Sequence, residues 1–168
     1  QDEIRHYIAP CGEAIPLLAK VELLIHSEKR LLHSRYHTAA HLLANIVETL
    51  YPGLKANKGH SFPGEAYVEF QGGEPIELLL VQAAISAAIA TNPKIKAFEM
   101  DALGFEQQFY PIPYRVAAKE SVRAVQIGDL PPILCGGTHV ATLQEVGALS
   151  VIKNKNKNNV LRMVYEVA

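Results

Sequence analysis

The chain lacks a long hydrophobic run, has almost no excess of charge of either sign and contains very little cysteine. Its longest mostly apolar stretch, residues 76–91, is too short and too polar to span a bilayer and is typical of a buried helix. The net charge of -1 argues against nucleic-acid binding through overall charge but allows a local basic patch. Two cysteines, Cys11 and Cys135, are too few for a disulfide framework, so we expect a reducing, cytoplasmic setting.

What the chain does contain predicts one compact domain of the α+β class. At 168 residues and 49% hydrophobic content it can bury a substantial core. Ser27 followed by Glu28 is a plausible helix cap with an acid in the first turn, and Pro52-Gly53 is a typical helix end, so a helix is expected from residue 27 to residue 50.

The remaining patterns predict an antiparallel β-sheet with packed helices. Apolar alternation indicates strands at residues 66–70, 94–100 and 121–127, with weaker strands at 4–9 and 19–26. A helix is expected at 74–90, a short helix or irregular piece at 102–110, and a turn-rich loop at 57–64. Two apolar strands, 148–152 and 160–167, flank the polar connector 153–159 and predict a hairpin.

The most informative residues are two histidines four apart, His37 and His41, inside a run of good helix formers. On a helix they lie one turn apart on the same face and can bind one ion together. A half-exposed or hydrogen-bonded pair is the alternative, because this spacing is common by chance.

A second pair with the same spacing, Cys135 and His139, follows about a hundred residues later. The intervening Gly136 and Gly137 can take positive φ and could turn both side chains inward. Imidazole and thiolate are preferred zinc ligands, so the two pairs together predict a Zn²⁺ site between a helix and a loop.

The sequence lacks the motifs of several other zinc enzymes. A peptidase of the H-E-x-x-H kind needs glutamate at position 38, which is Thr38, and the inverse order needs it at position 40, which is Ala40. The same absence counts against small lyases that cleave S-ribosylhomocysteine and carry a His-Thr-x-Glu-His motif.

Several motifs resemble one family. HTAAHLL at 37–43, GHSFPGEAYVEF at 59–70, CGGTH at 135–139 and EVGALSVIKNKNKNN at 145–159 are similar to the editing domain of alanyl-tRNA synthetase and its free-standing AlaX relatives. The second domain of threonyl-tRNA synthetases carries the same paired elements. The resemblance covers about residues 28–167, and it implies the metal ligands His37, His41, Cys135 and His139.

By this resemblance the chain is a zinc-dependent aminoacyl-tRNA deacylase. It would act in trans on tRNA(Ala) mischarged with serine, with glycine as a second amino acid. Editing of Ser-tRNA(Thr) and a non-catalytic, zinc-stabilised tRNA-binding module are the alternatives. Residues 27–168 would form the editing domain, and residues 1–26 the end of an upstream β-rich segment, since longer relatives have one. We therefore expect the natural protein to continue upstream.

An activated ester needs a positioned water and oxyanion stabilisation more than a strong nucleophile. Thr38, His60 and Ser61 are the candidate catalytic groups. Thr38 and the loop from Asn57 to Ser61 also offer groups that could bind a serine hydroxyl, and an ordinary solvated loop is the alternative. His139 is hypothesised to be a weaker, exchangeable ligand, because zinc activates water only through an open position.

A basic group on the predicted hairpin is the candidate tRNA contact. Lys153, Lys155, Lys157 and Arg162 lie on or beside its connector, and Lys58, with Lys55 nearby, forms a possible second group. Such runs are usually solvated turns, but a polyanionic substrate favours phosphate contact. The partner is thus expected to be tRNA, and no membrane is expected.

Overall fold

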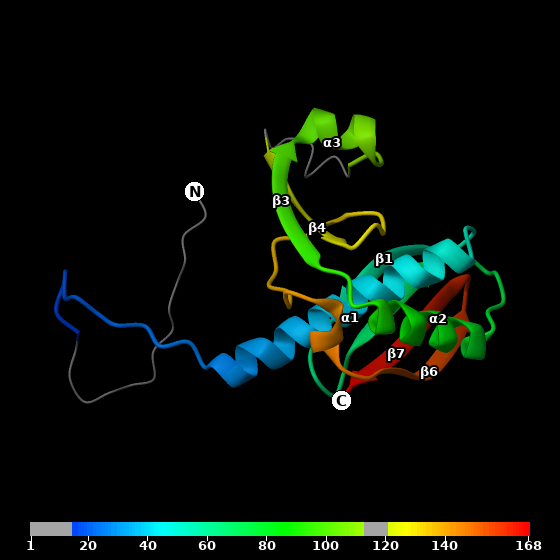
Figure 1. Cartoon of the computed structure of the whole chain (residues 1–168), viewed down its shortest axis with the longest axis horizontal. Coiled ribbons are helices and arrows are strands. Elements are labelled where there is room, and N and C mark those ends of the chain that lie inside the picture. The colour runs from blue at the N-terminus through cyan, green and yellow to red at the C-terminus, as the bar shows by residue number, and fades with distance from the viewer. Residues whose placement is uncertain (1–14, 113–120) are drawn as a thin grey trace.

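The fold has two antiparallel sheets around one long helix (Figure 1). The computed structural model describes residues 15–112 and 121–168. The four-stranded sheet has the order β1-β2-β7-β6, formed by Lys55–His60, Tyr67–Gln71, Val160–Val167 and Leu149–Lys157. The three-stranded sheet has the order β3-β4-β5, formed by Ile95–Asp101, Ser121–Ile127 and Ile133–Leu134. Every strand pair is antiparallel, which confirms the α+β prediction.

Helix α1, Ser27–Leu50, organises the molecule. Its residues from Ser34 to Val47 are mostly buried, whereas its first turns are exposed and project from the body of the fold (Figure 1). The predicted helix limits are confirmed, but the cap is His26, whose Nδ1 accepts a hydrogen bond from the Lys29 amide, and not Ser27. The imidazole therefore satisfies one of the free amides of the first turn.

The main core lies between α1 and the four-stranded sheet. Val68 and Phe70 of β2, with Leu161, Met163 and Tyr165 of β7, alternate inward and are almost completely buried. The Tyr165 hydroxyl donates to the Tyr36 carbonyl of α1, at 2.8 Å, so this buried polar group is satisfied. Helix α2, Leu78–Thr91, packs beside α1 through Val81 and Ile85.

A smaller core lies under helix α3, Ala102–Gln108. Phe105 packs with Val122 and Ala124 of β4 and with Ile112, which follows α3. Figure 1 shows β3, β4 and α3 on one side of α1, with β6 and β7 on the other. The 3-10 helix η1, Leu143–Val146, lies in the connection from the three-stranded sheet to β6. Among the residues that the structure describes, no helix has both the length and the apolar character for a bilayer crossing.

Four predictions of local structure are wrong. Residues 19–26 form no strand, and residues 57–60 belong to β1 instead of a loop. Helix α2 begins at Leu78, later than expected. The connector 153–159 is mostly strand, because β6 runs to Lys157 and only Asn158 and Asn159 turn the chain. The hairpin itself is confirmed, and the strand expected at 4–9 lies outside the described residues.

Candidate metal centre and adjoining pocket

Four side chains from α1 and the loop after β5 converge. His37, His41, Cys135 and His139 each offer one ligand atom, and these atoms all lie within 4.8 Å of one another. The Cys135 Sγ atom lies 3.4 Å from His37 Nε2 and 3.4 Å from His139 Nε2. One thiol and three imidazoles at such separations form a donor set suited to zinc.

Thr38, between the two helical histidines, orients the cluster from behind. Its side chain is fully buried, and its hydroxyl donates to the Ser34 carbonyl at 2.8 Å. With that hydrogen committed, the hydroxyl oxygen accepts from His139 Nδ1, 3.1 Å away, and from the Val140 amide. His139 therefore carries its proton on Nδ1, which leaves the Nε2 lone pair facing Cys135.

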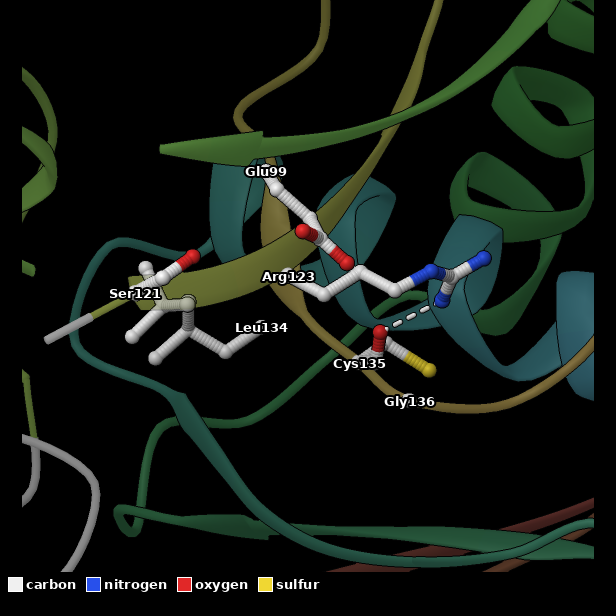
Figure 2. A pocket seen from close by; sticks show the side chains of 7 residues that line it. Glu99, Ser121, Arg123, Leu134, Cys135 and Gly136 are labelled. Carbon is white, nitrogen blue, oxygen red and sulfur yellow. Dashed lines mark hydrogen bonds between the residues drawn. The ribbon is translucent and has the colours of Figure 1, made fainter. Parts of the chain in front are cut away.

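Arg123 of β4 fixes the loop that carries Cys135. Its Nη1 donates to the Cys135 carbonyl at 2.6 Å (Figure 2). The same atom donates to the Gly137 carbonyl at 3.1 Å. The Gly137 amide donates to the Cys135 sulfur. The side of Cys135 next to β4 also borders a pocket of about 360 Å³ that Glu99 and Arg123 help to line (Figure 2).

In this loop a glycine is needed for the room that it leaves beside His37, and not for an unusual backbone φ angle. The prediction that Gly136 and Gly137 take positive φ is wrong, because neither does so. A Cβ on Gly137 would collide with the His37 ring, whereas one on Gly136 would meet nothing within 4 Å. Gly137 is therefore the residue that lets the loop approach α1 closely.

Burial keeps the imidazoles neutral. It is the main cause that lowers the pKa of His37, lowers that of His41 well below 6.5 and lowers that of His139 to about 3. A hydrogen bond with the Thr138 backbone partly opposes this effect by raising the pKa of His37. Neighbouring rings lower the pKa of His41 and His139 further. Arg123 lowers the pKa of His37 and His139. Burial also raises the pKa of the Cys135 thiol, which a bound cation would oppose.

One buried atom distinguishes this cluster from an ordinary hydrogen-bonded group of histidines. The Nδ1 of His41 is buried and has no hydrogen-bond partner in the described part of the chain. An unsatisfied nitrogen is costly in a purely structural role, so the side chains fit a metal-binding group better than a structural one.

A pocket of about 390 Å³ adjoins the cluster. His37, His41 and Cys135 line one side of it, and Asn57 and Ser61 contribute polar groups. Asn57 lies where the β1–β2 register shifts, between Ala56 and Lys58, so it is an extra residue that the bulge redirects. Polar side chains and ligand residues therefore line the same pocket.

The other predicted site residues lie elsewhere. His60 is not among the pocket residues; its ring stacks on Phe62 and lies near Tyr67, and its Nε2 is 3.5 Å from Glu65. Thr38 contacts ligand residues and is too deeply buried to line the pocket. Lys58 lines the pocket and also lies over the Tyr67 ring.

Three of the candidate tRNA contacts lie together on the four-stranded sheet. Lys153, Lys155 and Arg162 line a shallow pocket of about 350 Å³ with Glu65, Tyr67 and Val164. Lys157 is exposed further along β6 and pairs with Val160. Sequence reasoning missed Tyr67, Arg123 and Ser34, because single residues on alternating elements give no signal by themselves.

Known proteins resemble this chain over most of its length. Residues 122–165 match the family described as the threonyl and alanyl tRNA synthetase second additional domain. The alanyl-tRNA editing protein AlaX-L of Pyrococcus horikoshii is 29% identical over 159 residues, which cover 93% of this chain and 39% of that protein. These similarities support the resemblance to alanyl-tRNA editing proteins of the AlaX type.

Two aminoacyl-tRNA synthetases are also similar to the chain. A threonine–tRNA ligase of Clostridium perfringens is 28% identical, covering 89% of this chain and 26% of the ligase. An alanine–tRNA ligase of Desulfitobacterium hafniense is 25% identical, covering 89% of this chain and 18% of the ligase. The chain thus spans between about a fifth and two fifths of these relatives.

Proposed function

We propose that this chain is a zinc-dependent aminoacyl-tRNA deacylase that hydrolyses tRNA(Ala) mischarged with serine, with glycine as a second amino acid, and that it acts in trans in the cytoplasm. The convergence of four ligand atoms within 4.8 Å beside a polar pocket is the observation that carries this proposal. The family relationship supports tRNA as the partner. Within this proposal residues 27–168 are the editing domain.

The residues of the chain divide the chemistry between them. When bound by His37, His41, Cys135 and His139, zinc supplies Lewis-acid polarisation or a coordination position for the substrate. His139 bears on the choice between these two roles. Thr38 holds the His139 Nε2 atom towards the cluster, and His139 would have to give up this orientation in order to act as an exchangeable ligand. We therefore assign Thr38 a positioning role.

Selection of the amino acid would depend on the polar side of the pocket. A synthetase site for alanine cannot strongly reject glycine or serine, so fidelity requires a second site that accepts them. Asn57 and Ser61 could hydrogen-bond a serine hydroxyl, and Ser61 could also help hold the attacking water. His60, at the edge of the sheet, fits contact with RNA better than chemistry.

The tRNA backbone would lie against the cationic side chains of the sheet. Replacing Lys153, Lys155 and Lys157 with alanine should weaken tRNA binding. The slope of the logarithm of the binding constant against the logarithm of the salt concentration should become less steep, by roughly 0.7 to 0.9 for each phosphate that is no longer neutralised. Fluorescence titration at several salt concentrations measures both quantities. Lys96→Ala, exposed on β3, is the matched control, and an unchanged slope in the triple variant would contradict the assignment.

Similarity to threonine–tRNA ligase favours a second candidate function, the editing of Ser-tRNA(Thr). One experiment separates the possibilities: deacylation of Ser-tRNA(Ala), Ser-tRNA(Thr) and Ala-tRNA(Ala), with chelator, and with zinc restored. We expect hydrolysis of Ser-tRNA(Ala) that chelator abolishes and zinc restores. Faster hydrolysis of Ser-tRNA(Thr) would reassign the substrate, and tRNA binding without any hydrolysis would indicate a non-catalytic module.

A further inference from the structure

The side of the four-stranded sheet that faces away from α1 carries an aromatic and cationic surface, which we call the outer face. Val68 and Phe70 point inward on β2, so the intervening Tyr67 and Glu69 lie on the outer face. On β7 the same alternation places Arg162 and Val164 there. Lys153 and Lys155 of β6 pair with Val164 and Arg162 and therefore share this face.

A planar stack occupies the middle of the outer face. The Arg162 guanidinium carbon lies 3.5 Å from the centroid of the Tyr67 ring, and Arg162 Nη1 is 3.6 Å from Glu69. The Arg162 side chain is still 48% exposed. A guanidinium that rests on an aromatic ring and keeps free surface is a good platform for a nucleic-acid base.

Cationic groups surround this platform. The outer face and its rim carry five cationic side chains against three carboxylates, although the chain as a whole has a net charge of -1. The cations are Lys58, Lys153, Lys155, Lys157 and Arg162, and the carboxylates are Glu65, Glu69 and Glu166. Two of the carboxylates already have a partner, since Glu69 lies beside the Arg162 guanidinium and Glu65 lies beside the His60 ring. Charge complementarity therefore favours a polyanion.

Aromatic rings lead from the outer face towards α1. His60 lies 5.8 Å from Tyr67 and 5.0 Å from Phe62, measured between ring centroids. Phe62, which is 52% exposed, makes an edge contact with His33 of α1. Ser61, between the two rings in sequence, lines the pocket beside the ligand atoms. An unpaired strand could thus run from the outer face towards that pocket with a ring beneath successive bases.

We propose that the outer face binds an unpaired RNA segment, with one base stacked on the Arg162–Tyr67 pair and the adjoining phosphates on Lys153 and Lys155. The proposal deepens the proposed function and rests on it for RNA as the substrate class. It assigns single-stranded, not duplex, RNA to this surface, because stacking on Arg162 needs an exposed base face.

The test measures binding of a short unpaired oligoribonucleotide containing 2-aminopurine, whose fluorescence falls when the base stacks. Zinc-loaded protein should quench the probe and bind the same oligonucleotide in a duplex more weakly. Arg162→Lys keeps the positive charge but removes the planar guanidinium group. Affinity for the oligonucleotide should therefore fall about tenfold and quenching should be lost, while the salt dependence of binding should change little. Lys155→Gln should show the opposite pattern, with a flatter salt dependence and retained quenching.

Aromatic variants and a distant lysine provide the controls. Tyr67→Phe keeps the ring and should retain quenching, whereas Tyr67→Leu should lose it. Lys96→Ala should change nothing, and circular dichroism and bound zinc are used to check folding. Absence of binding or quenching by the wild type, or unchanged quenching in Arg162→Lys, would overturn the proposal. Deacylation of Ser-tRNA(Ala) by the wild type is measured separately, so failure of the stacking surface and failure of the deacylase function are distinguishable.

Discussion

Thr38 is a buried hydroxyl that orients one of the candidate metal ligands, His139, without being a ligand candidate itself. It bonds Ser34, His139 and Val140 at once. Thr38→Val keeps the shape and removes these bonds, so zinc affinity should fall about 10- to 100-fold. Competition with a chromophoric chelator measures the change.

Thr49→Val is the matched control for this variant. Thr49 makes the same bond to a carbonyl four residues earlier in α1, to Asn45, but it has no contact with the cluster. Its replacement should leave zinc affinity unchanged. Equal zinc affinity in Thr38→Val and the wild type would remove Thr38 from the metal site.

The buried imidazoles should also give the metal-free chain a pH-dependent stability. Burial holds the pKa of His41 well below 6.5 and lowers that of His139 to about 3. The unfolded chain binds protons on these rings below about pH 6.5 while the folded chain does not, so the free energy of unfolding should decrease as the pH falls from 6.5 towards 3. Above pH 6.5 these groups contribute no further change.

Urea unfolding in chelator at about pH 7.5 and about pH 5 measures this dependence. The midpoint should be lower at the acid pH, and the difference should shrink in His41→Gln, which lacks one of the rings. An identical pH dependence in His41→Gln would show that other groups are responsible.

At the residue scale the sequence was most informative where residues recur at a fixed spacing. His37 with His41 and Cys135 with His139 could be singled out because the helix period and the loop length bring each pair together. Arg123 could not, because its role depends on two carbonyls of a loop that only the folded chain brings within reach.

Among the elements, the loop from Cys135 to His139 depends on one glycine for space. Gly137→Ala would push its Cβ into the His37 ring, so zinc affinity should fall by at least tenfold, whereas Gly136→Ala should have little effect. Zinc titration of both variants provides the comparison. A similar loss in both variants would mean that backbone freedom, and not the contact with His37, explains the glycines.

Strands were predictable where one face is buried. The limits of β4 were predicted correctly, and the hairpin of β6 and β7 was recognised, because apolar residues alternate there. Strand β1 was missed because it is an edge strand whose residues are nearly all exposed, so its sequence has no apolar alternation. Its existence depends on hydrogen bonds to β2, which local patterns do not reveal.

For the molecule as a whole, the ligand cluster joins two cores. His37 and His41 come from the helix on the four-stranded sheet, while Cys135 and His139 follow the three-stranded sheet. Zinc at a thousandfold excess over its dissociation constant should stabilise the folded chain by about 4 kcal/mol. Chelation should therefore lower the thermal midpoint, as calorimetry can measure.

The corresponding control is the same scan on His41→Ala. Chelator should cause a much smaller shift in that variant, because a ligand is already missing. A wild-type midpoint that does not respond to chelator, in protein shown to contain zinc beforehand, would mean that the ion does not couple the two cores.

The sheet order β1-β2-β7-β6 also affects how the protein is made. Strand β7 is the last of these to leave the ribosome, yet it lies between β2 and β6. The edge of β2 that pairs with β7 therefore has no partner strand until residues 160–167 are synthesised. We expect the sheet to form completely only after translation of this segment. A nascent chain arrested shortly before residue 160 should be sensitive to protease and prone to aggregate.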